Sequence, residues 1–331
     1  MTRSTSLVLA VDGGQTSSKA IIATPDGHIL GQGTGSACDH LHGPNGYERN
    51  RDAIQSSAQA ALADAGRDAS EIGIVGLGLT SAPRESERLR LFDKMVREIC
   101  TPETIWVDSD FVSNLAGASG GEPGIVVIAG GGSIGYGVDP SGREAIAGGL
   151  GYLMGDEGSG WYLGLRAIQE SARAFDLRGP ETALLPMVLD HYGIQTIRQI
   201  IRIIYNQDFL REQVSVLAPK VVAIAESGDA VATEIVTTGA ERLAGLALGA
   251  MRQLQQPGDE VVVYPTGGIF KAGPMIMDSF TNTIQAAWPT ASVHNPRFPP
   301  VVGAYLRAID HAGIEVDDGI RARLSESLAA L

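Results

Sequence analysis

A glycine-rich turn near the start of the chain has the residues needed to hold a phosphate group. Its sequence is Asp12-Gly13-Gly14-Gln15-Thr16, and it follows a short apolar run typical of a buried strand. Glycines in such a turn let backbone N–H groups approach an anion without obstruction by Cβ atoms, and Thr16 adds a hydroxyl donor. Asp12, at the end of the strand, is placed to hold Mg²⁺ directly or through water, as phosphoryl transfer requires. An ordinary tight turn with a capping aspartate is the alternative.

A second turn of the same type, Gly130-Gly131-Gly132-Ser133, follows another apolar run. It has no lysine and does not match the P-loop pattern, so the chain is not a P-loop enzyme. Each turn by itself is common between strands. As a matched pair on equivalent strands, the two turns are expected to face each other across a cleft and to hold the β- and γ-phosphates of ATP.

Two aspartates, Asp108 and Asp110, lie between a predicted strand at 105–107 and a predicted helix at 111–118. On an extended chain both side chains point the same way, because one residue separates them. A carboxylate here suits a general base that takes the proton from a hydroxyl group as the oxygen attacks phosphorus. The other carboxylate, with Ser109, suits a helix cap. The residues alone leave the two roles unassigned.

A third glycine-rich segment, residues 148–160, holds six glycines in thirteen positions. Gly148 and Gly149 begin it, and Asp156 and Glu157 lie within it. This density of glycine permits close backbone approach to a polyhydroxyl ligand, and carboxylates accept hydrogen bonds from sugar hydroxyls. The segment therefore favours sugar binding, with a structural loop and an acidic helix cap as the alternative.

Two further patterns are weaker. Gly267 and Gly268 follow a predicted strand at 261–264, and a glycine pair there would let a flat adenine ring lie against the backbone. Asp39 and His40 lie in a loop after the third predicted strand. A metal site that includes a second nearby histidine is conceivable there, but solvated loop residues are favoured.

The composition excludes several classes of function. The 331 residues carry a formal net charge of -13 and no cluster of Lys and Arg with interleaved aromatics, so no nucleic-acid partner is expected. An anionic substrate must then be held by backbone amides or a metal ion. No apolar run is long enough to span a membrane. The two cysteines lie outside any metal-binding spacing, which favours a reducing cytoplasm.

The elements that must position these residues occur twice along the chain. Hydrophobic periodicity predicts the order βββαβαβ for the first part, with a helix at 47–65 that ends at Gly66. The segments VLAVDGGQTSSKAIIATPDG and IVVIAGGGSIGYGVDPSG share a strand, a glycine-rich turn, a second strand and a turn with Pro and Gly. We therefore predict an α/β fold with two duplicated halves.

A chain of this length is too long for one hydrophobic core and predicts two domains. Gly, Ser, Glu and Pro gather at 117–124 and mark the boundary. We expect an N-terminal domain at 1–118, a C-terminal domain with a helical insertion at 119–300, and closing helices at 301–331. Packing of those helices back onto the N-terminal domain is one arrangement.

In this order, the motifs resemble the N-acetylglucosamine kinase and BadF/BadG/BcrA/BcrD ATPase family of the actin, sugar kinase and Hsp70-like superfamily. The resemblance runs nearly end to end and rests on VDGGQTSSKA, VIAGGGSIGYG, GGLGYLMGDEGSGWYLG, PTGGIF and PPVVGAYLRA. These segments are similar to the first and second phosphate motifs, the characteristic family segment, the adenosine motif and the C-terminal segment. The five motifs in order are specific, whereas any one is not.

The resemblance implies two ribonuclease H-like, actin-like ATPase domains that flank a cleft for nucleotide and sugar. It implies an ATP-dependent kinase that phosphorylates an amino sugar of the N-acetylglucosamine or glucosamine class, with Mg²⁺ as a cofactor, and a homodimer. It assigns the catalytic base to Asp110, in SDF, and leaves Asp108 a structural role. It also implies that Asp12 serves Mg-ATP and that Asp156 contacts the sugar.

Three positions depart from the family pattern and bear on the identity of the sugar. Leu150 stands where many N-acetylglucosamine kinases have Trp, and Gly131 stands where they have Thr. Asp39-His40 takes the place of the Asn-His pair of the sugar-binding loop. An anionic Asp39 near the sugar would favour a cationic amino sugar such as glucosamine over an N-acetylated one, by charge complementarity.

Two other functions are possible on the same fold. A BadF-type ATPase that activates an acyl-CoA dehydratase or reductase would hold an iron–sulfur cluster through cysteine pairs, but neither Cys38 nor Cys100 lies in a glycine-rich cluster loop. A non-enzymatic nucleotide sensor would have no use for a base at Asp110. The kinase is therefore the favoured interpretation.

Overall fold

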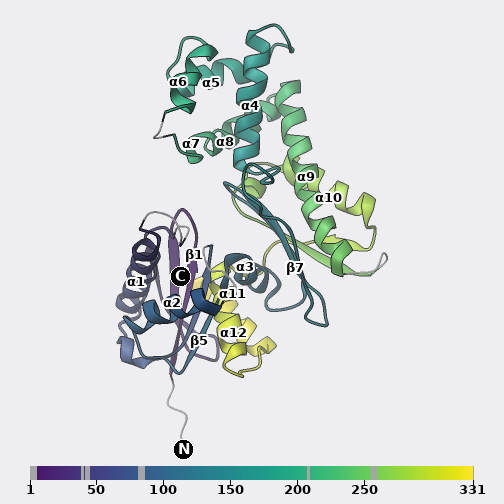
Figure 1. The fold of residues 1–331 in the computed structure, drawn as a ribbon. Helices are drawn as coiled ribbons and strands as arrows, with labels where there is room; N and C mark the ends of the chain where they lie inside the picture. The colour runs from purple at the N-terminus through teal and green to yellow at the C-terminus, as the bar shows by residue number, and fades with distance from the viewer. Residues whose placement is uncertain are drawn as a thin grey trace, which may run out of the picture. The chain divides into compact units, whose positions relative to one another are not determined.

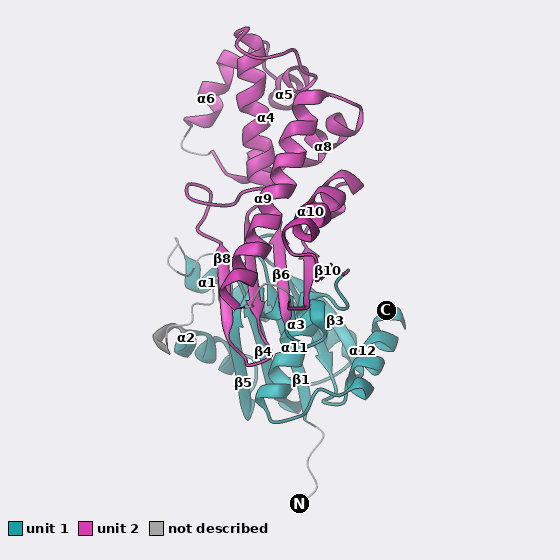
Figure 2. Ribbon diagram, turned by 90° about the vertical axis from the view of Figure 1, so that its right-hand side faces the viewer, with its two compact units in different colours: residues 1–123, 295–331 teal, residues 124–294 magenta. Residues whose placement is uncertain are grey.

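The computed structural model describes residues 6–38, 41, 45–80, 86–206, 209–254 and 259–330. The chain divides into two compact units, shown in different colours in Figure 2. Unit 1 comprises residues 1–123 and 295–331, and unit 2 comprises residues 124–294. The two C-terminal helices therefore belong to unit 1.

Unit 1 contains a five-stranded sheet with the strand order β3-β2-β1-β4-β5. Its strands are β1 (Leu7–Gly13), β2 (Ser18–Ala23), β3 (Ile29–Gly35), β4 (Ile72–Leu79) and β5 (Thr104–Ser109). The first three pair in antiparallel fashion, whereas β4 and β5 run parallel to β1. Because parallel strands end at the same edge of a sheet, the residues that follow β1, β4 and β5 are brought together.

Helices cover both faces of this sheet. They are α1 (Gly46–Ala65), α2 (Ser86–Arg97), α3 (Asp110–Ser119), α11 (Pro300–His311) and α12 (Asp318–Ala330), with the short 3₁₀ helix η1 (Ala69–Glu71) before β4. Helix α1 packs on β2 and β3, and α11 packs on β1, β4 and α3. Leu9 and Val11 of β1 join the core that contains α1, and the intervening Ala10 is also fully buried. Burial on both faces explains why β1 is continuously apolar.

Unit 2 repeats the sheet of unit 1. Its strand order is β10-β9-β6-β7-β8, with β6 (Gly124–Ala129), β7 (Ser133–Val138), β8 (Glu144–Gly148), β9 (Val261–Thr266) and β10 (Ala291–Val293). Strands β6, β7 and β8 are antiparallel, and β9 and β10 run parallel to β6. Strand β6 thus takes the place that β1 has in unit 1, and the predicted α/β fold with two duplicated halves is confirmed.

The helices of unit 2 lie mainly between β8 and β9 in the chain. They are α4 (Gly160–Phe175), α5 (Leu184–Tyr192), α6 (Ile201–Ile204), α7 (Glu212–Ser215), α8 (Ala218–Glu226), α9 (Ala230–Leu254) and α10 (Pro274–Ala287), with the 3₁₀ helices η2 (Ile197–Ile200) and η3 (Ile269–Lys271). Figure 1 shows α4 to α8 gathered at one end of the unit, and α9 runs from them to the sheet. There α9 packs on β6, β7 and β8. The chain between β8 and β9 is therefore mostly helical.

Candidate functional site

In the first glycine turn of unit 1, two carbonyl groups accept hydrogen bonds from other segments of the chain. The Gly13 carbonyl accepts a hydrogen bond from the Thr80 N–H at 2.9 Å, and the Gly14 carbonyl accepts one from the Cys38 N–H at 3.0 Å. In a trans peptide the N–H group points opposite to the carbonyl, so the Gln15 N–H points away from Cys38. In the part of the chain that the structure describes, the N–H groups of Gln15 and Thr16 have no hydrogen-bond partner. The turn therefore presents free amide donors at an exposed position.

Gly13 is required by close packing below the turn. A Cβ atom there would lie 2.5 Å from both the Cys38 sulfur and a methyl group of Leu79. Real Cβ atoms do not approach other atoms so closely, so any larger residue would push the turn away from the sheet.

The second glycine turn, in unit 2, is built on the same principle. The Gly130 carbonyl accepts the Gly160 N–H at 2.8 Å, and the Gly131 carbonyl accepts the Trp161 N–H at 3.3 Å. Both donors belong to the first turn of α4, where N–H groups lack partners within the helix. The N–H groups of Gly131 and Gly132 point the opposite way, and neither has a hydrogen-bond partner among the residues described. Two adjacent free amides of this kind form an anion-binding concavity.

Asp156 lies directly below this second turn. It is 5% exposed and adopts a left-handed backbone conformation with φ of 58°. Its Oδ1 accepts the Ser133 N–H at 2.9 Å, and its Oδ2 lies 2.7 Å from Nη2 of Arg211. The carboxylate is thus partnered within unit 2. The predicted contact of Asp156 with sugar stays a prediction.

The other predicted residues of the third glycine-rich segment lie nearby. The Glu157 side chain is exposed, and its carbonyl accepts a hydrogen bond from the Ser133 hydroxyl at 2.8 Å. Gly148 and Gly149 have φ values of 72° and 69°, which favour glycine, and the Gly149 N–H bonds to the Ser133 carbonyl. The helix cap that follows is Ser159, whose hydroxyl accepts the Tyr162 N–H.

Gly267 and Gly268 follow β9, the parallel neighbour of β6. Gly267 has a φ of 100°, and a Cβ atom there would collide with the Ala129 carbonyl oxygen, just before the second glycine turn. The predicted adenosine motif and the second phosphate turn therefore lie at the same edge of one sheet. Asp39 and His40 fall outside the described residues.

Asp12 and Asp110 lie at the ends of parallel strands in unit 1. Asp12 is the second-last residue of β1, and Asp110 follows β5 as the first residue of α3. Burial, together with the nearby Asp110 carboxylate, raises the pKa of Asp12 to about 7, although Lys19 opposes this rise. Lys19 is the residue paired with Asp12 on β2. Two carboxylates that share one partly buried site repel each other, which disfavours their simultaneous ionisation.

Asp110 has the properties of a general base that works near neutral pH. Burial raises its pKa to about 6, and hydrogen bonds from the Thr80 side chain and the Phe111 N–H limit the rise. A base with such a pKa is ionised at pH 7 and still binds a proton well. Asp108 instead accepts the N–H of Ser109 at 2.7 Å, one residue after it in β5.

The acidic pair fits a divalent cation. Among the described residues, no group of three or more His, Cys, Asp or Glu side chains is placed to bind a metal. Mg²⁺ often takes only one or two protein carboxylates and completes its shell with water and phosphate oxygens, so Asp12 with Asp110 nearby suits it. Burial and the Asp110 carboxylate raise the pKa of Asp12 more than Lys19 lowers it, and a bound cation would favour the ionised form.

Sequence reasoning missed two residues that contact the predicted groups. Thr80 follows β4 and bonds both to the first turn and to Asp110. Its position directly after a buried strand was the feature of the sequence that could have indicated a site residue. Arg211, which precedes α7, bonds to the Gly131 carbonyl and pairs with Asp156. No local pattern in the sequence marks it.

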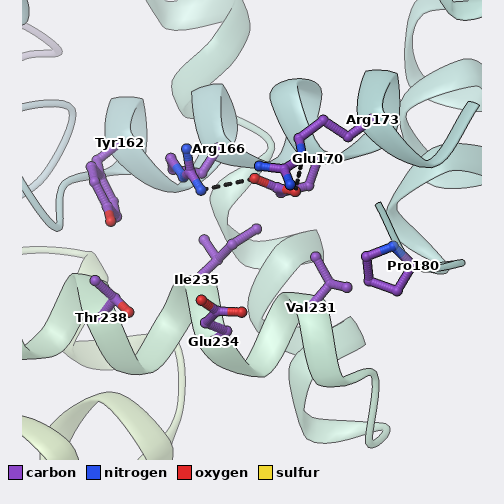
Figure 3. Close-up of a pocket in the computed structure, with 9 residues that line it drawn as sticks. All are labelled: Tyr162, Arg166, Glu170, Arg173, Pro180, Val231, Glu234, Ile235 and Thr238. Carbon is purple, nitrogen blue, oxygen red and sulfur yellow. Dashed lines mark hydrogen bonds and ion pairs between the residues drawn. The ribbon is translucent and has the colours of Figure 1, made fainter. Parts of the chain in front are cut away.

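A cavity of about 230 Å³ lies in the helical part of unit 2 (Figure 3). It is lined by side chains of α4 and α9 and by Pro180, and none of the predicted site residues is among them. Arg166 and Arg173 both pair with the buried Glu170 at its edge, at 2.8 and 3.4 Å. The cavity is therefore separate from the second glycine turn, which lies in the same unit. No described helix is long and apolar enough to cross a membrane.

The sequence is similar to those of known amino-sugar kinases. The chain is 26% identical over 91% of its length to an N-acetylmuramic acid/N-acetylglucosamine kinase of Clostridium acetobutylicum, of which it covers 97%. It is 28% identical over 69% of its length to the glucosamine kinase GspK of Vibrio cholerae, of which it covers 74%.

A similar fold is known from a crystal structure. A Chromobacterium violaceum protein that carries an N-acetylglucosamine kinase assignment matches 92% of this chain and 99% of its own, with 29% identity and a TM-score of 0.73. The sequence model of the BadF/BadG/BcrA/BcrD ATPase family matches residues 9–308. This match spans both glycine turns and both sheets, and the chain therefore belongs to the BadF/BadG/BcrA/BcrD ATPase family.

Proposed function

We propose that this protein is an ATP-dependent kinase that transfers the γ-phosphoryl group to a hydroxyl of an amino sugar. The observation that carries the proposal is Asp110, a half-buried carboxylate with a pKa of about 6 at the sheet edge that also bears the first glycine turn. This pKa and the position of Asp110 at the carboxyl end of β5 suit a base that accepts a hydroxyl proton. The similarity to kinases of Clostridium acetobutylicum and Vibrio cholerae supports the same conclusion.

In the proposed reaction, backbone amides hold the phosphates. In unit 1 the free N–H groups of Gln15 and Thr16 are donors for phosphate oxygens, and in unit 2 those of Gly131 and Gly132 are. Gly267 and Gly268 receive the adenosine. Because the chain has a net charge of -13, we expect neutral backbone donors, and not a basic surface, to bind an anionic substrate.

Asp110 then acts as the base. Its carboxylate accepts the proton of the sugar hydroxyl while the hydroxyl oxygen forms a bond to the γ-phosphorus and the bond to the ADP oxygen breaks. Mg²⁺, held through Asp12, supplies charge neutralisation of the phosphate oxygens when it is bound. Thr80 keeps the Asp110 carboxylate oriented by its hydrogen bond.

The sugar is an amino sugar of the N-acetylglucosamine or glucosamine class in this proposal. One relative is named for N-acetylated sugars and the other for glucosamine, so the similarity does not distinguish the two substrates. Asp39, His40, Gly148, Gly149, Asp156 and Glu157 are the proposed sugar contacts. The homodimer, the Mg²⁺ ion and the cytoplasmic location belong to the same proposal.

The cysteines do not favour the iron–sulfur alternative. Cys38 and Cys100 are both buried inside unit 1, and burial raises the pKa of the Cys100 thiol to about 11. Cluster ligands are thiolates, so a thiol that resists ionisation is a poor ligand.

The test is an ADP-release assay with glucosamine, N-acetylglucosamine, N-acetylmuramic acid and glucose as acceptors. We expect turnover with at least one amino sugar and a loss of kcat of roughly 10²- to 10⁴-fold in Asp110→Asn. The variant should still bind ADP, because the amide donors are intact. Undiminished turnover in Asp110→Asn would remove its assignment as the base.

A further inference from the structure

Arg211 joins three parts of unit 2 at the second glycine turn. Its Nη2 donates a hydrogen bond to the Gly131 carbonyl at 2.6 Å and lies 2.7 Å from Oδ2 of Asp156. Its guanidinium also lies 5.8 Å from the ring centre of Tyr152, in the third glycine-rich segment. A residue of the helical insertion is thus in direct contact with the turn that is proposed to hold ATP.

The hydrogen bond from Arg211 to the Gly131 carbonyl influences the direction in which the Gly132 N–H group points. The carbonyl of Gly131 and the N–H of Gly132 belong to one planar peptide and point in opposite directions. The Trp161 N–H also bonds to this carbonyl, but at 3.3 Å, whereas the bond from Arg211 is short and charge-assisted. Arg211 therefore makes the stronger of the two contacts that keep the Gly132 N–H turned outward.

The Arg211–Asp156 pair packs closely against the backbone of Gly132. A Cβ atom on Gly132 would lie 2.7 Å from Nη2 of Arg211 and 2.6 Å from Oδ1 of Asp156. The ion pair is thus in contact with the backbone of the turn. Its side chains are 24% and 5% exposed, respectively, so the pair is largely withdrawn from water.

We propose that Arg211 is a positioning residue for ATP binding, which fixes the Gly131–Gly132 peptide so that its amide faces the phosphates. The inference rests on the proposed function, since it assumes that this turn binds ATP. Arg211 acts together with Asp156: without the guanidinium, an uncompensated carboxylate would remain below the turn and repel the phosphates. Lysine, a point charge, is not equivalent to a planar guanidinium at a site with two acceptors.

The first experiment separates this role from general stability. Arg211→Met and Arg211→Lys are compared with Arg198→Met, a surface arginine of the same unit whose side chain is 72% exposed. ADP binding with MgCl₂ is measured by calorimetry, and KM is measured for ATP and for the sugar. We expect Arg211→Met to raise the Kd for ADP and the KM for ATP by roughly tenfold or more, and the sugar KM by less, because Asp156 keeps its bond from the Ser133 N–H.

Arg211→Lys should fall between Arg211→Met and wild type, and Arg198→Met should match wild type. The melting temperature is measured alongside, so that a variant that does not fold is recognised. A wild-type ADP affinity in both folded Arg211 variants would overturn the proposal, as would equal losses for ATP and sugar. If wild-type protein binds no ADP and phosphorylates no sugar, the proposed function itself fails instead.

A double-variant comparison tests whether Arg211 works through Asp156. Asp156→Asn keeps an acceptor for the Ser133 N–H but removes the charge that Arg211 neutralises. We expect Arg211→Met/Asp156→Asn to bind ADP more tightly than Arg211→Met alone, because no buried charge is left over. Additive losses of ADP affinity would show that Arg211 does not work through Asp156 and would overturn that part of the proposal.

Discussion

The Thr80 side chain donates a hydrogen bond to the Asp110 carboxylate, and the Thr80 N–H bonds to the Gly13 carbonyl. One residue after β4 thus connects the proposed base to the proposed phosphate turn. The connection follows from the sheet, because β4 lies between β1 and β5 and all three strands are parallel. No local pattern in the sequence predicts the contact between residues 80 and 110.

Replacement of Thr80 should loosen the orientation of the Asp110 carboxylate and raise its pKa further, which slows the reaction without removing the base. Thr80→Val keeps the shape of the side chain but loses the hydroxyl, and we expect kcat to fall about tenfold, the cost of a hydrogen bond to a charged group. Thr80→Ser keeps the hydroxyl and should retain most of the activity. Steady-state rates with saturating ATP and sugar check this, and equal rates for Val and Ser variants would contradict it.

The raised pKa of Asp12 predicts a pH-dependent stability penalty. The folded-state pKa is about 7, against an ordinary value of 3.8, so the folded protein binds this proton more tightly than the unfolded chain. Stability contributed by the neutral form is therefore lost as pH rises from about 4 to about 7. In metal-free buffer at pH 8, the melting temperature of Asp12→Asn should be about 2–4 °C higher than that of the wild type.

The same comparison at pH 4 is the control. There the wild-type carboxyl is neutral in the folded state, and the melting temperatures of wild type and Asp12→Asn should converge. A constant difference at both pH values would mean that packing, not charge, distinguishes them. Addition of Mg²⁺ at pH 8 should stabilise the wild type and leave Asp12→Asn nearly unchanged, because Asp12 is the proposed ligand.

Two neighbouring glycines after β9 should respond differently to substitution. Gly267→Ala places a Cβ atom against the Ala129 carbonyl and forces φ of 100° on alanine, whereas Gly268 has open space and is not in that conformation. We expect Gly267→Ala to lower the free energy of unfolding by at least about 1–2 kcal/mol, and Gly268→Ala by much less. Urea unfolding of both variants provides the measurement, and similar losses would be inconsistent with the geometry.

The charge of Asp39 should bias the choice of sugar. If Asp39 lies near the amino group, Asp39→Asn should lower kcat/KM for glucosamine relative to N-acetylglucosamine, because the attraction to the cation is lost. The ratio of the two kcat/KM values, measured for wild type and variant at the same pH, is the readout. An unchanged ratio would remove charge as the basis of selectivity.

Local sequence patterns were enough to predict the fold of each half and the strand ends at which the proposed chemical groups lie. Buried strands such as β1 are continuously apolar, helices such as α1 show the 3.6-residue period, and glycine clusters mark the sharp turns, so local pattern is enough to locate them. The duplication is visible because both halves repeat the same strand and turn pattern. Asp12 and Asp110 were found because each follows a predicted strand.

The side chains that support these groups could be identified only in the folded chain. Asp156 was expected to contact sugar, and the structure shows it beneath the second turn, where it binds the Ser133 amide and pairs with Arg211. Thr80 and Arg211 lie far along the chain from their partners, at residues 110 and 131. Hydrogen bonds between distant segments depend on strand order and helix packing, and neither leaves a local trace in the sequence.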